Sequence, residues 1–285
     1  MKKKARVLLI LLAVLMVLIL RGFYNALTVR RYTVKAPGLA GSVRVALITD
    51  LHACAYGEGQ RELLDAVDAE APDLVLLGGD IFDDDLPDGN AETFLRGIAG
   101  RYPICYVTGN HEYWSGRDGF ARKMAILQEC GVQRLSGEAV TFQLNGSLIT
   151  VCGVDDPYAW AESSGFTERT EGSFRQQLAK AAEQAKGSAY TILLTHRPEL
   201  MDVYSTYSFS LVLAGHAHGG QWRIPWILNG LFAPNQGLFP RYAGGQYEKD
   251  GTLMIVSRGL ARESTPVPRW YNRPELVIIQ LDPAQ

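Results

Sequence analysis

Short hydrophobic runs recur along the chain from Val43 onward, and most of them end in glycine or in a polar residue. Five runs have the length and composition of buried strands: 43–49, 74–77, 104–108, 190–195 and 211–214. Between them lie segments in which apolar residues recur at helical spacing: 60–70, 90–100, 117–130 and 173–186. The pattern predicts buried strands that are connected by amphipathic helices.

Further strands are expected in the second half of the chain. Residues 140–144 and 147–153 flank Asn145-Gly146, a dipeptide typical of two-residue hairpin turns. Residues 252–257 and 275–281 are two more strand-like runs. Strands that alternate with helices and are then followed by several strands in succession predict an α/β (α+β) fold, in which packed sheets carry helices on their outer faces.

The N-terminal segment has a different character from the rest of the chain. A basic cluster at residues 2–6 precedes an unbroken apolar run, Val7–Leu20. A helix of this run reaches about 21 Å, whereas the hydrocarbon core of a bilayer is about 30 Å thick, so a membrane span must extend through Arg21 toward Val29. No small-x-small site follows the run, and we therefore favour an uncleaved signal anchor over a cleaved signal peptide.

The basic cluster predicts a single-pass N-terminal anchor with its N-terminus in the cytoplasm and the folded domain outside it. Residues 1–42 are accordingly assigned to a basic flank, membrane anchor and linker, and residues 43–285 to one folded domain. The cations that follow the run, among them Arg30 and Arg31, weaken this charge bias and belong either to a solvated linker or to contacts with anionic head groups.

Composition narrows the class of protein. The hydrophobic fraction of 47% and the charged fraction of 20% are ordinary for a globular chain, and a formal charge of -2 argues against a dedicated nucleic-acid binder. No nucleic-acid partner is therefore expected. The four cysteines are widely spaced without a C-x-x-C pair, which favours small buried side chains over a disulfide framework or a zinc site.

Residues able to bind metal ions stand where the predicted strands end, and all five histidines occupy such positions. The set is Asp50, His52, Asp80, Asn110, His111, His196, His216 and His218. Carboxylate, imidazole and amide ligands suit manganese, iron or zinc better than calcium, and there are enough of them for two divalent ions. Two such ions can hold both the attacking and the leaving oxygen of a displacement at phosphorus.

The order of these residues resembles that of the calcineurin-like metallophosphoesterase superfamily over about residues 43–281. Five blocks carry the resemblance: Asp50-Leu51-His52, Gly79-Asp80, Gly109-Asn110-His111-Glu112, His196 and Gly215-His216-Ala217-His218. The resemblance implies a four-layer αββα sandwich of two mixed β-sheets flanked by helices.

The same resemblance implies a role for each residue. Asp50, His52 and His218 would bind one metal ion, Asn110, His196 and His216 the other, and Asp80 would bridge the two. His111 would not be a ligand but the catalytic residue that protonates the leaving oxygen or stabilises its charge, with Glu112 orienting it.

Departures from related groups narrow the implied activity. Thr108 replaces the arginine that protein Ser/Thr phosphatases carry before Gly-Asn-His-Glu, and the segment after Asp80 lacks the iron-binding tyrosine of purple acid phosphatases. The chain looks like the bacterial membrane-associated phosphodiesterase branch. That likeness implies hydrolysis of phosphodiester or pyrophosphodiester bonds, in a substrate that can be lipid-linked, by metal-activated water.

Three alternatives stay open. The first is a pyrophosphatase acting on a UDP-2,3-diacylglucosamine-type lipid, and the second is a non-catalytic metal-binding scaffold. The third is a nuclease, which the net charge and the anchor disfavour.

Two loops near these motifs are ambiguous. The acidic residues Asp83, Asp84, Asp85 and Asp88 are interpreted as a solvated turn rather than a third metal site. The segment 222–239 contains Trp222, Trp226, Leu231, Phe232 and Phe239. If exposed, it would form a lip for an acyl chain or the bilayer surface, and if buried it would cover a sheet edge. Arg223 within this segment and Arg241 just beyond it are expected to be solvated.

Overall fold

Two six-stranded mixed sheets packed face to face form the centre of the computed structural model, which describes residues 2–160, 168–264 and 267–284. The first sheet has the order β1 (Thr28–Pro37), β14 (Glu275–Ala284), β2 (Val43–Ile48), β3 (Leu74–Gly78), β4 (Ile104–Val107) and β5 (Gln133–Arg134). The second has the order β12 (Gly245–Lys249), β13 (Thr252–Val256), β9 (Leu211–Ala214), β8 (Thr191–Leu194), β7 (Ser147–Gly153) and β6 (Glu138–Leu144).

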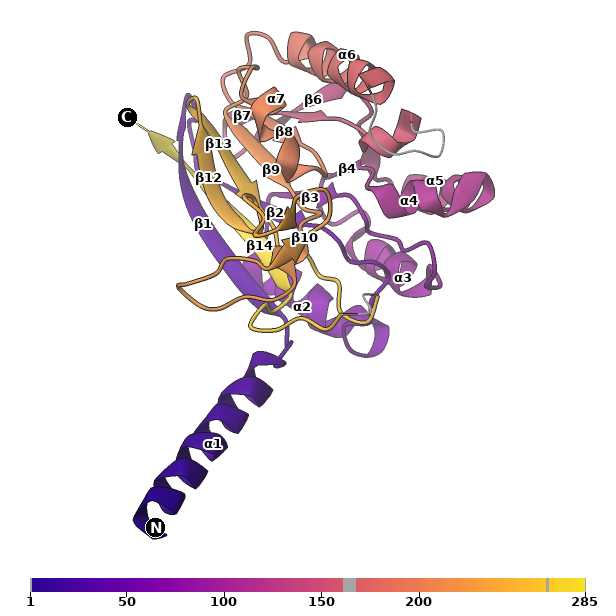
Figure 1. The fold of residues 1–285 in the computed structure, drawn as a ribbon. Helices are drawn as coiled ribbons and strands as arrows, with labels where there is room; N and C mark the ends of the chain where they lie inside the picture. The colour runs from indigo at the N-terminus through magenta and orange to yellow at the C-terminus, as the bar shows by residue number, and fades with distance from the viewer. Residues whose placement is uncertain (1, 161–167, 265–266, 285) are drawn as a thin grey trace.

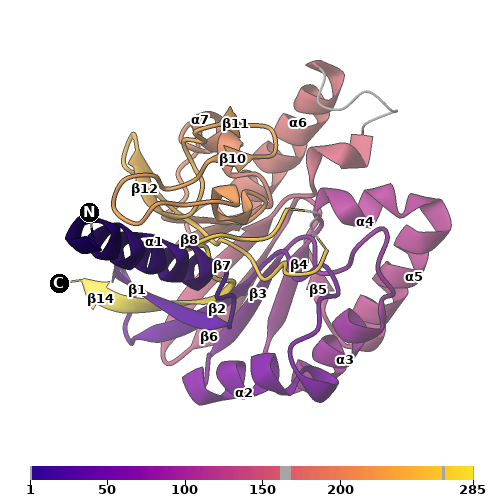
Figure 2. The same cartoon turned by 60° about the horizontal axis from the view of Figure 1, so that its bottom comes forward.

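Helices cover the outer faces of both sheets (Figures 1 and 2). Beside the first sheet lie α2 (Arg61–Glu70), α3 (Gly89–Ile98), α4 (Asn110–Trp114) and α5 (Gly116–Glu129). Beside the second lie α6 (Glu168–Gln184) and α7 (Met201–Tyr204), and a small ribbon of β10 (Phe232–Ala233) and β11 (Gly237–Leu238) stands apart from both sheets. The predicted four-layer αββα sandwich is thus confirmed.

The alternation of side chains along each strand explains why both faces of the sheets are apolar. In β2, Val45 and Leu47 pack into the core between the sheets, while Ala46 and Ile48 pack toward the helices. Successive residues of a strand point to opposite faces, so a strand buried on both sides appears in the sequence as a continuous hydrophobic run. The four cysteines are buried and free, as the sequence indicated.

Parallel pairing determines where the strand ends lie. Strands β2, β3 and β4 are mutually parallel, and so are β7, β8, β9 and β13. The carboxyl ends of parallel strands meet at one edge of a sheet, which is where ligands bind in open α/β sheets. The predicted metal-binding residues therefore come together at adjacent edges of the two sheets.

Strand β1 lies in the segment that the sequence analysis assigned to a linker. It pairs in parallel with β14 over its whole length, from Thr28 opposite Glu275 to Pro37 opposite Ala284. Its sequence contains three cationic residues, and only Val34 and Ala36 are buried, as is typical of a strand at the edge of a sheet. The first sheet thus includes a strand N-terminal to the predicted domain boundary at Val43.

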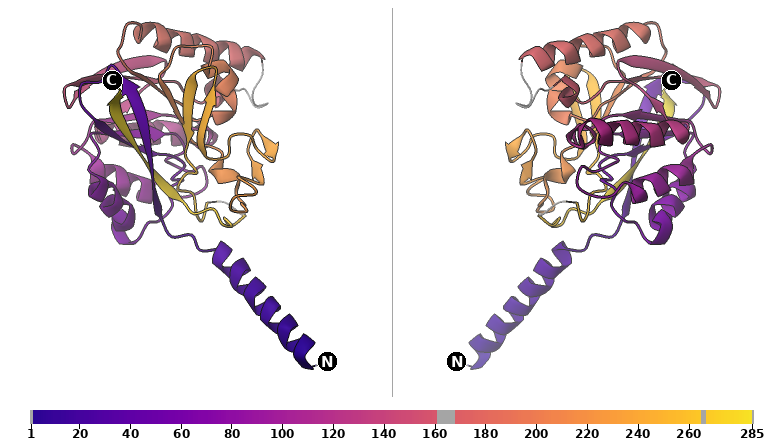
Figure 3. Two further views of the ribbon diagram at one scale, coloured as in Figure 1. Left: turned by 90° about the vertical axis from the view of Figure 1, so that its left-hand side faces the viewer. Right: turned by 90° about the vertical axis from the view of Figure 1, so that its right-hand side faces the viewer.

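Helix α1 (Lys2–Gly22) projects from the domain (Figures 1 and 3). Its apolar side chains are exposed along its length. Among the described residues, one helical segment, Lys3–Gly22, is both long enough and apolar enough to cross a membrane, judged by length and composition. At about 1.5 Å per residue it reaches about 30 Å. The basic residues at its ends supply the length that the apolar run Val7–Leu20 lacks.

Two truncations test the contribution of β1. A chain that begins at Thr28 retains the strand, whereas a chain that begins at Val43 loses the burial of Val34, Ala36 and Leu39 and leaves an edge of β14 unpaired. Full burial of one Val or Leu side chain contributes about 1.5–3 kcal/mol. We therefore expect the free energy of unfolding of the chain that begins at Val43 to be at least about 3 kcal/mol lower than that of the chain that begins at Thr28. Urea denaturation of both proteins measures the difference, and equal midpoints would contradict it.

Candidate metal centre

Five of the predicted ligand residues have positive φ angles in the loops that follow β2, β3 and β9. Their φ angles are 51° at Asp50, 48° at His52, 51° at Asp80, 64° at His216 and 47° at His218. Such conformations cost about 1–3 kcal/mol each in residues other than glycine and cluster at functional sites. At each of these positions the chain turns sharply and directs the side chain toward a common centre.

Glycines let the backbone approach the two central carboxylates closely. A Cβ atom on Gly109 would lie 2.1 Å from Asp80 Oδ1, and one on Gly215 would lie 2.6 Å from Asp50 Oδ2. The space is used by hydrogen bonds, because the backbone N–H of His111 donates to Asp80 Oδ1 at 2.9 Å and that of His216 donates to Asp50 Oδ1 at 2.9 Å. Both carboxylates are therefore held in fixed orientations.

The candidate ligands form two groups. Donor atoms of Asp50, His52 and His218 lie within 4.8 Å of one another, and so do those of Asp80, His196 and His216. Asp80 Oδ2 lies between the groups, 3.6 Å from His52 Nε2 and 3.1 Å from His196 Nε2.

Asn110 lies beside the second group. It lines the same small cavity, of about 130 Å³, as Asp80 and His216. The structure thus brings all seven predicted metal-binding residues together.

Unpartnered buried atoms show that this centre fits metal ions. His52 Nε2 and Asp80 Oδ2 are buried and have no hydrogen-bond partner among the described residues. A buried polar atom without a partner costs about 1–3 kcal/mol, so the arrangement is unfavourable unless another group fills the centre. Divalent cations of the manganese, iron or zinc type match this set of nitrogen and oxygen donors.

The outward nitrogen of two histidines faces an acceptor. His52 Nδ1 lies 2.8 Å from Asp83 Oδ2, and His196 Nδ1 lies 2.8 Å from the carbonyl oxygen of Gly78. Each acceptor favours a proton on the nitrogen that faces it and leaves the other nitrogen available as a metal ligand. His216 differs, because its Nε2 lies 2.8 Å from Arg197 Nη1, a donor, and 2.9 Å from Asn235 Oδ1.

Burial and neighbouring charges determine the protonation of the centre. Burial, together with Arg197, lowers the pKa of His216 well below its ordinary value, and burial together with His52 does the same for His218. Both rings are consequently neutral, as ligation requires. Burial opposes ionisation of Asp80, but His196 and His111 outweigh it and hold the pKa of Asp80 well below its usual range.

His111, the predicted catalytic residue, stands at the wall of the cavity and is partly exposed. Its ring lies 4.3 Å from that of His52 and 4.5 Å from that of Trp114, and its Nδ1 contacts the carboxylate of Asp84. Nε2 is the nitrogen that remains for a substrate oxygen.

Glu112 was expected to orient His111 but occupies a different place. Its carboxylate accepts hydrogen bonds from the backbone N–H groups of Asp80, Ile81, Phe82 and Gly109. Burial and the charge of Asp80 raise the pKa of Glu112 to about 7. Glu112 therefore fixes the loop that carries Asp80, and Asp84 is the partner of His111.

The acidic loop is not the solvated turn that its sequence indicated. Asp83 is only 3% exposed, and its carboxylate contacts His52 while accepting the backbone N–H groups of Asp85 and Leu86. Neighbouring aspartates look equivalent in a sequence, and only the path of the loop after Asp80 distinguishes them. The residues that pair with histidines are Asp83 and Asp84.

Arg197 is a further residue of the centre that the sequence analysis missed. Its buried guanidinium pairs with Asp156, and its Nη2 donates to Asn110 Oδ1 at 3.2 Å. A positive charge beside a phosphate-sized cavity favours an anionic substrate. The available signal was its position directly after His196 at the end of a predicted strand.

Comparisons with known proteins agree with this geometry. Residues 43–220 match the family described as calcineurin-like phosphoesterase. An uncharacterized metallophosphoesterase of Helicobacter pylori strain J99 is 28% identical over 273 residues, which cover 92% of this chain and 67% of the relative. A bovine transmembrane protein with a metallophosphoesterase domain is 27% identical over 264 residues, covering 88% of this chain and 55% of that protein.

Solved structures share the fold at lower identity. The Plasmodium protein GAP50, the anchor in the inner membrane complex, superposes with a TM-score of 0.52 at 13% identity, covering 85% of this chain and 82% of that one. Haemophilus influenzae NAD nucleotidase superposes with a TM-score of 0.51 at 15% identity, covering 78% and 46%. From the family match and the shared fold, we conclude that the chain belongs to the calcineurin-like phosphoesterase family and is a metal-dependent phosphoester hydrolase.

Proposed function

We propose that the protein is a membrane-anchored phosphodiesterase that uses two divalent metal ions to hydrolyse phosphodiester or pyrophosphodiester bonds. The observation that carries the proposal is the position of Asp80 Oδ2 between two groups of ligand atoms. A carboxylate so placed can serve both ions at once. Helix α1, which is apolar, exposed and long enough to span a bilayer, supports the anchor.

Each group of ligands would hold one ion. Asp50, His52 and His218 would hold the first, Asn110, His196 and His216 the second, and Asp80 both; manganese, iron and zinc all suit this donor set. When bound, two such ions supply Lewis acidity and lower the pKa of coordinated water.

The chain's own residues position the substrate and assist the leaving group. The Asp84 carboxylate accepts a hydrogen bond from Nδ1–H of His111 and leaves Nε2 for the cavity. In the doubly protonated ring, the proton on Nε2 passes to the leaving oxygen, and the ring is left neutral with its remaining proton on Nδ1. The guanidinium of Arg197, fixed by Asp156, places positive charge beside the non-bridging phosphate oxygens. Trp114 and Tyr158 line the same cavity and restrict the group attached to the phosphate.

A lipid-linked substrate is the finer version of this proposal. The segment 222–239 begins beside the ligand His218 and places several large apolar side chains in solvent. That observation also favours the second candidate, a pyrophosphatase acting on a lipid of the UDP-2,3-diacylglucosamine type. The basic cluster before α1 supports a catalytic domain outside the cytoplasm.

Hydrolysis of bis-p-nitrophenyl phosphate and of p-nitrophenyl phosphate tests the proposed reaction. The full chain in detergent with added Mn²⁺ should hydrolyse the diester faster than the monoester, and Asp80→Asn should abolish both activities because the shared ligand is weakened. A folded, metal-loaded protein without turnover of either compound would instead favour the scaffold.

The pair formed by Asp84 and His111 makes a second prediction. His111→Ala should lower kcat on the diester by about 10²–10⁴ without loss of metal, as expected for a general acid. Asp84→Asn should lower kcat by a smaller factor and add nothing to His111→Ala, because it acts only through that ring. The exposed neighbour Asp85 offers a matched control, and an equal loss of kcat in Asp85→Asn would show that loop charge alone matters.

Removal of metal ions should destabilise the protein. Each ion that is present at about 100 times its dissociation constant stabilises the folded state by about 2.7 kcal/mol, so chelation of both ions by EDTA should lower Tm by about 10–20 °C. The shift should be much smaller in Asp80→Asn and unchanged in Asp85→Asn. Differential scanning fluorimetry with parallel metal analysis measures it, and identical EDTA shifts in wild type and Asp80→Asn would argue against Asp80 as a ligand.

A further inference from the structure

The apolar loop, which we define as residues 222–239, exposes large hydrophobic side chains beside the metal centre. Trp226 is 103% exposed, Ile227 82%, and Leu238 and Phe239 66% each. The sequence left open whether these residues are buried, and the structure shows that they are not. Soluble surfaces rarely expose contiguous apolar groups on this scale, so such a patch indicates a surface that is covered in the functional state.

The apolar loop and the metal centre are connected through the backbone. The 3₁₀ helix η4 (His218–Gly220) starts at a candidate ligand and leads directly into the loop. Later in the loop, Asn235 returns to the centre and contacts His216. Whatever covers the loop therefore lies at the mouth of the site.

Helix α1 leaves the domain beside the apolar loop. The ring of Trp222 lies 6.2 Å from that of Trp270, whose Nε1 donates to the carbonyl oxygen of Ile19 at 3.1 Å. The hydroxyl of Tyr271 donates to the carbonyl oxygen of Leu18 at 2.7 Å, which ties the same segment to the end of the helix. Figures 1 and 2 both place the loop at the end of the domain from which α1 projects.

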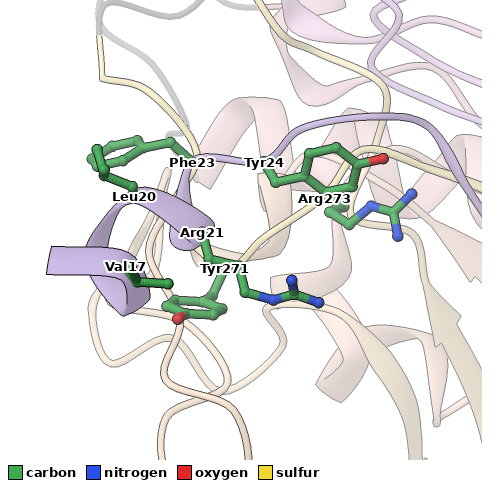
Figure 4. Close-up of a pocket in the computed structure, with 7 residues that line it drawn as sticks. All are labelled: Val17, Leu20, Arg21, Phe23, Tyr24, Tyr271 and Arg273. Carbon is green, nitrogen blue, oxygen red and sulfur yellow. The ribbon is translucent and has the colours of Figure 1, made fainter. Parts of the chain in front are cut away.

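Aromatic and cationic side chains mark the end of α1. A groove of about 860 Å³ between helix and domain is lined by Val17, Leu20, Arg21, Phe23, Tyr24, Tyr271 and Arg273 (Figure 4). Aromatic rings and arginines at the end of an apolar helix are typical of the boundary between hydrocarbon and water. Arg273 also donates to the carbonyl oxygens of Ala26 and Leu27, which fixes the groove to the chain just beyond the helix.

We propose that the apolar loop inserts into the interfacial region of the bilayer that α1 spans. This inference rests on the proposed anchor and deepens the proposed function, since it places the mouth of the metal centre at the membrane surface. The favoured substrate is then a phosphodiester that stays in the membrane by an acyl chain. An apolar hollow of about 320 Å³ lined by Trp222, Leu231 and Phe232, with Gln221 and Val267, is a place for part of that chain.

Continuity with α1 favours the bilayer over other occupants. An anchored helix holds the adjoining surface of the domain against lipid at all times. A soluble partner or a second copy of this chain would have to displace that lipid to reach Trp226 and Ile227. Contact of the loop with the bilayer, in contrast, requires no association step beyond the anchoring of α1.

Site-directed fluorescence in proteoliposomes tests the insertion. The four native cysteines are buried, so an environment-sensitive dye can be attached selectively to single introduced cysteines. Ile227→Cys reports the apolar loop and Leu12→Cys reports the middle of α1. Leu148→Cys is the matched control, because Leu148 is also exposed and apolar but lies far from α1. Its hairpin contacts the chain beyond the far end of β1, where Ser147 Oγ accepts a hydrogen bond from the backbone N–H of Gly41.

The full-length proteins are reconstituted into phosphatidylcholine and phosphatidylglycerol vesicles with and without lipids that carry a nitroxide on the acyl chain. We expect quenching at Ile227→Cys to approach that at Leu12→Cys and to exceed that at Leu148→Cys several-fold. Quenching at Leu12→Cys alone would leave the anchor in place and overturn the insertion. A blue-shifted but unquenched dye at Ile227→Cys would assign the surface to protein and overturn it as well.

Activity measured in the same vesicles separates this inference from the proposed function. Turnover of bis-p-nitrophenyl phosphate without quenching at Ile227→Cys would retain the phosphodiesterase and refute the insertion. Quenching without turnover would support the insertion and refute the proposed reaction. Absence of quenching at Leu12→Cys would refute the anchor and, with it, the insertion.

Discussion

The buried carboxylate of Asp80 is the constraint on which the rest of the structure depends. An ionised carboxylate removed from water is unfavourable unless positive charge or hydrogen-bond donors surround it. Here the backbone N–H of His111 serves one oxygen, and imidazole nitrogens of His52 and His196 approach the other. These groups lie in the segments that follow β2, β4 and β8, so the requirement at one carboxylate couples both sheets.

That coupling explains the backbone around the centre. Loops that follow parallel strands must turn at once to present their side chains to Asp80, and the left-handed conformations at the ligands result from this requirement. Close approach excludes a Cβ atom at Gly109, and the carboxylate of Glu112 binds the N–H groups left free by the turn. Conformational strain at the ligands is thus offset by a dense set of hydrogen bonds and by burial of the strands behind them.

The sequence predicted that the residues following the parallel strands come together at one edge of the sheets. Blocks at Asp50 and His216 are 166 residues apart, yet each follows a buried hydrophobic run, and the carboxyl ends of such strands meet. Strand β1 was not predicted, because an edge strand buries few residues and because the adjacent Arg30 and Arg31 are typical of a solvated linker. The contact between Asp84 and His111 depends on the path of a loop, which local sequence patterns do not specify.

Exposure of the apolar side chains of the apolar loop to water is unfavourable, and the fold does not require apolar residues there. The candidate ligands lie at strand ends, with Asn235 against His216, so polar residues in place of Trp226 and Ile227 would leave the candidate metal centre unchanged. In water each exposed side chain favours aggregation, whereas beside a helix that spans a bilayer the same side chains gain by leaving water. The proposed insertion into the bilayer would thus account for an apolar surface that adjoins both α1 and the cavity.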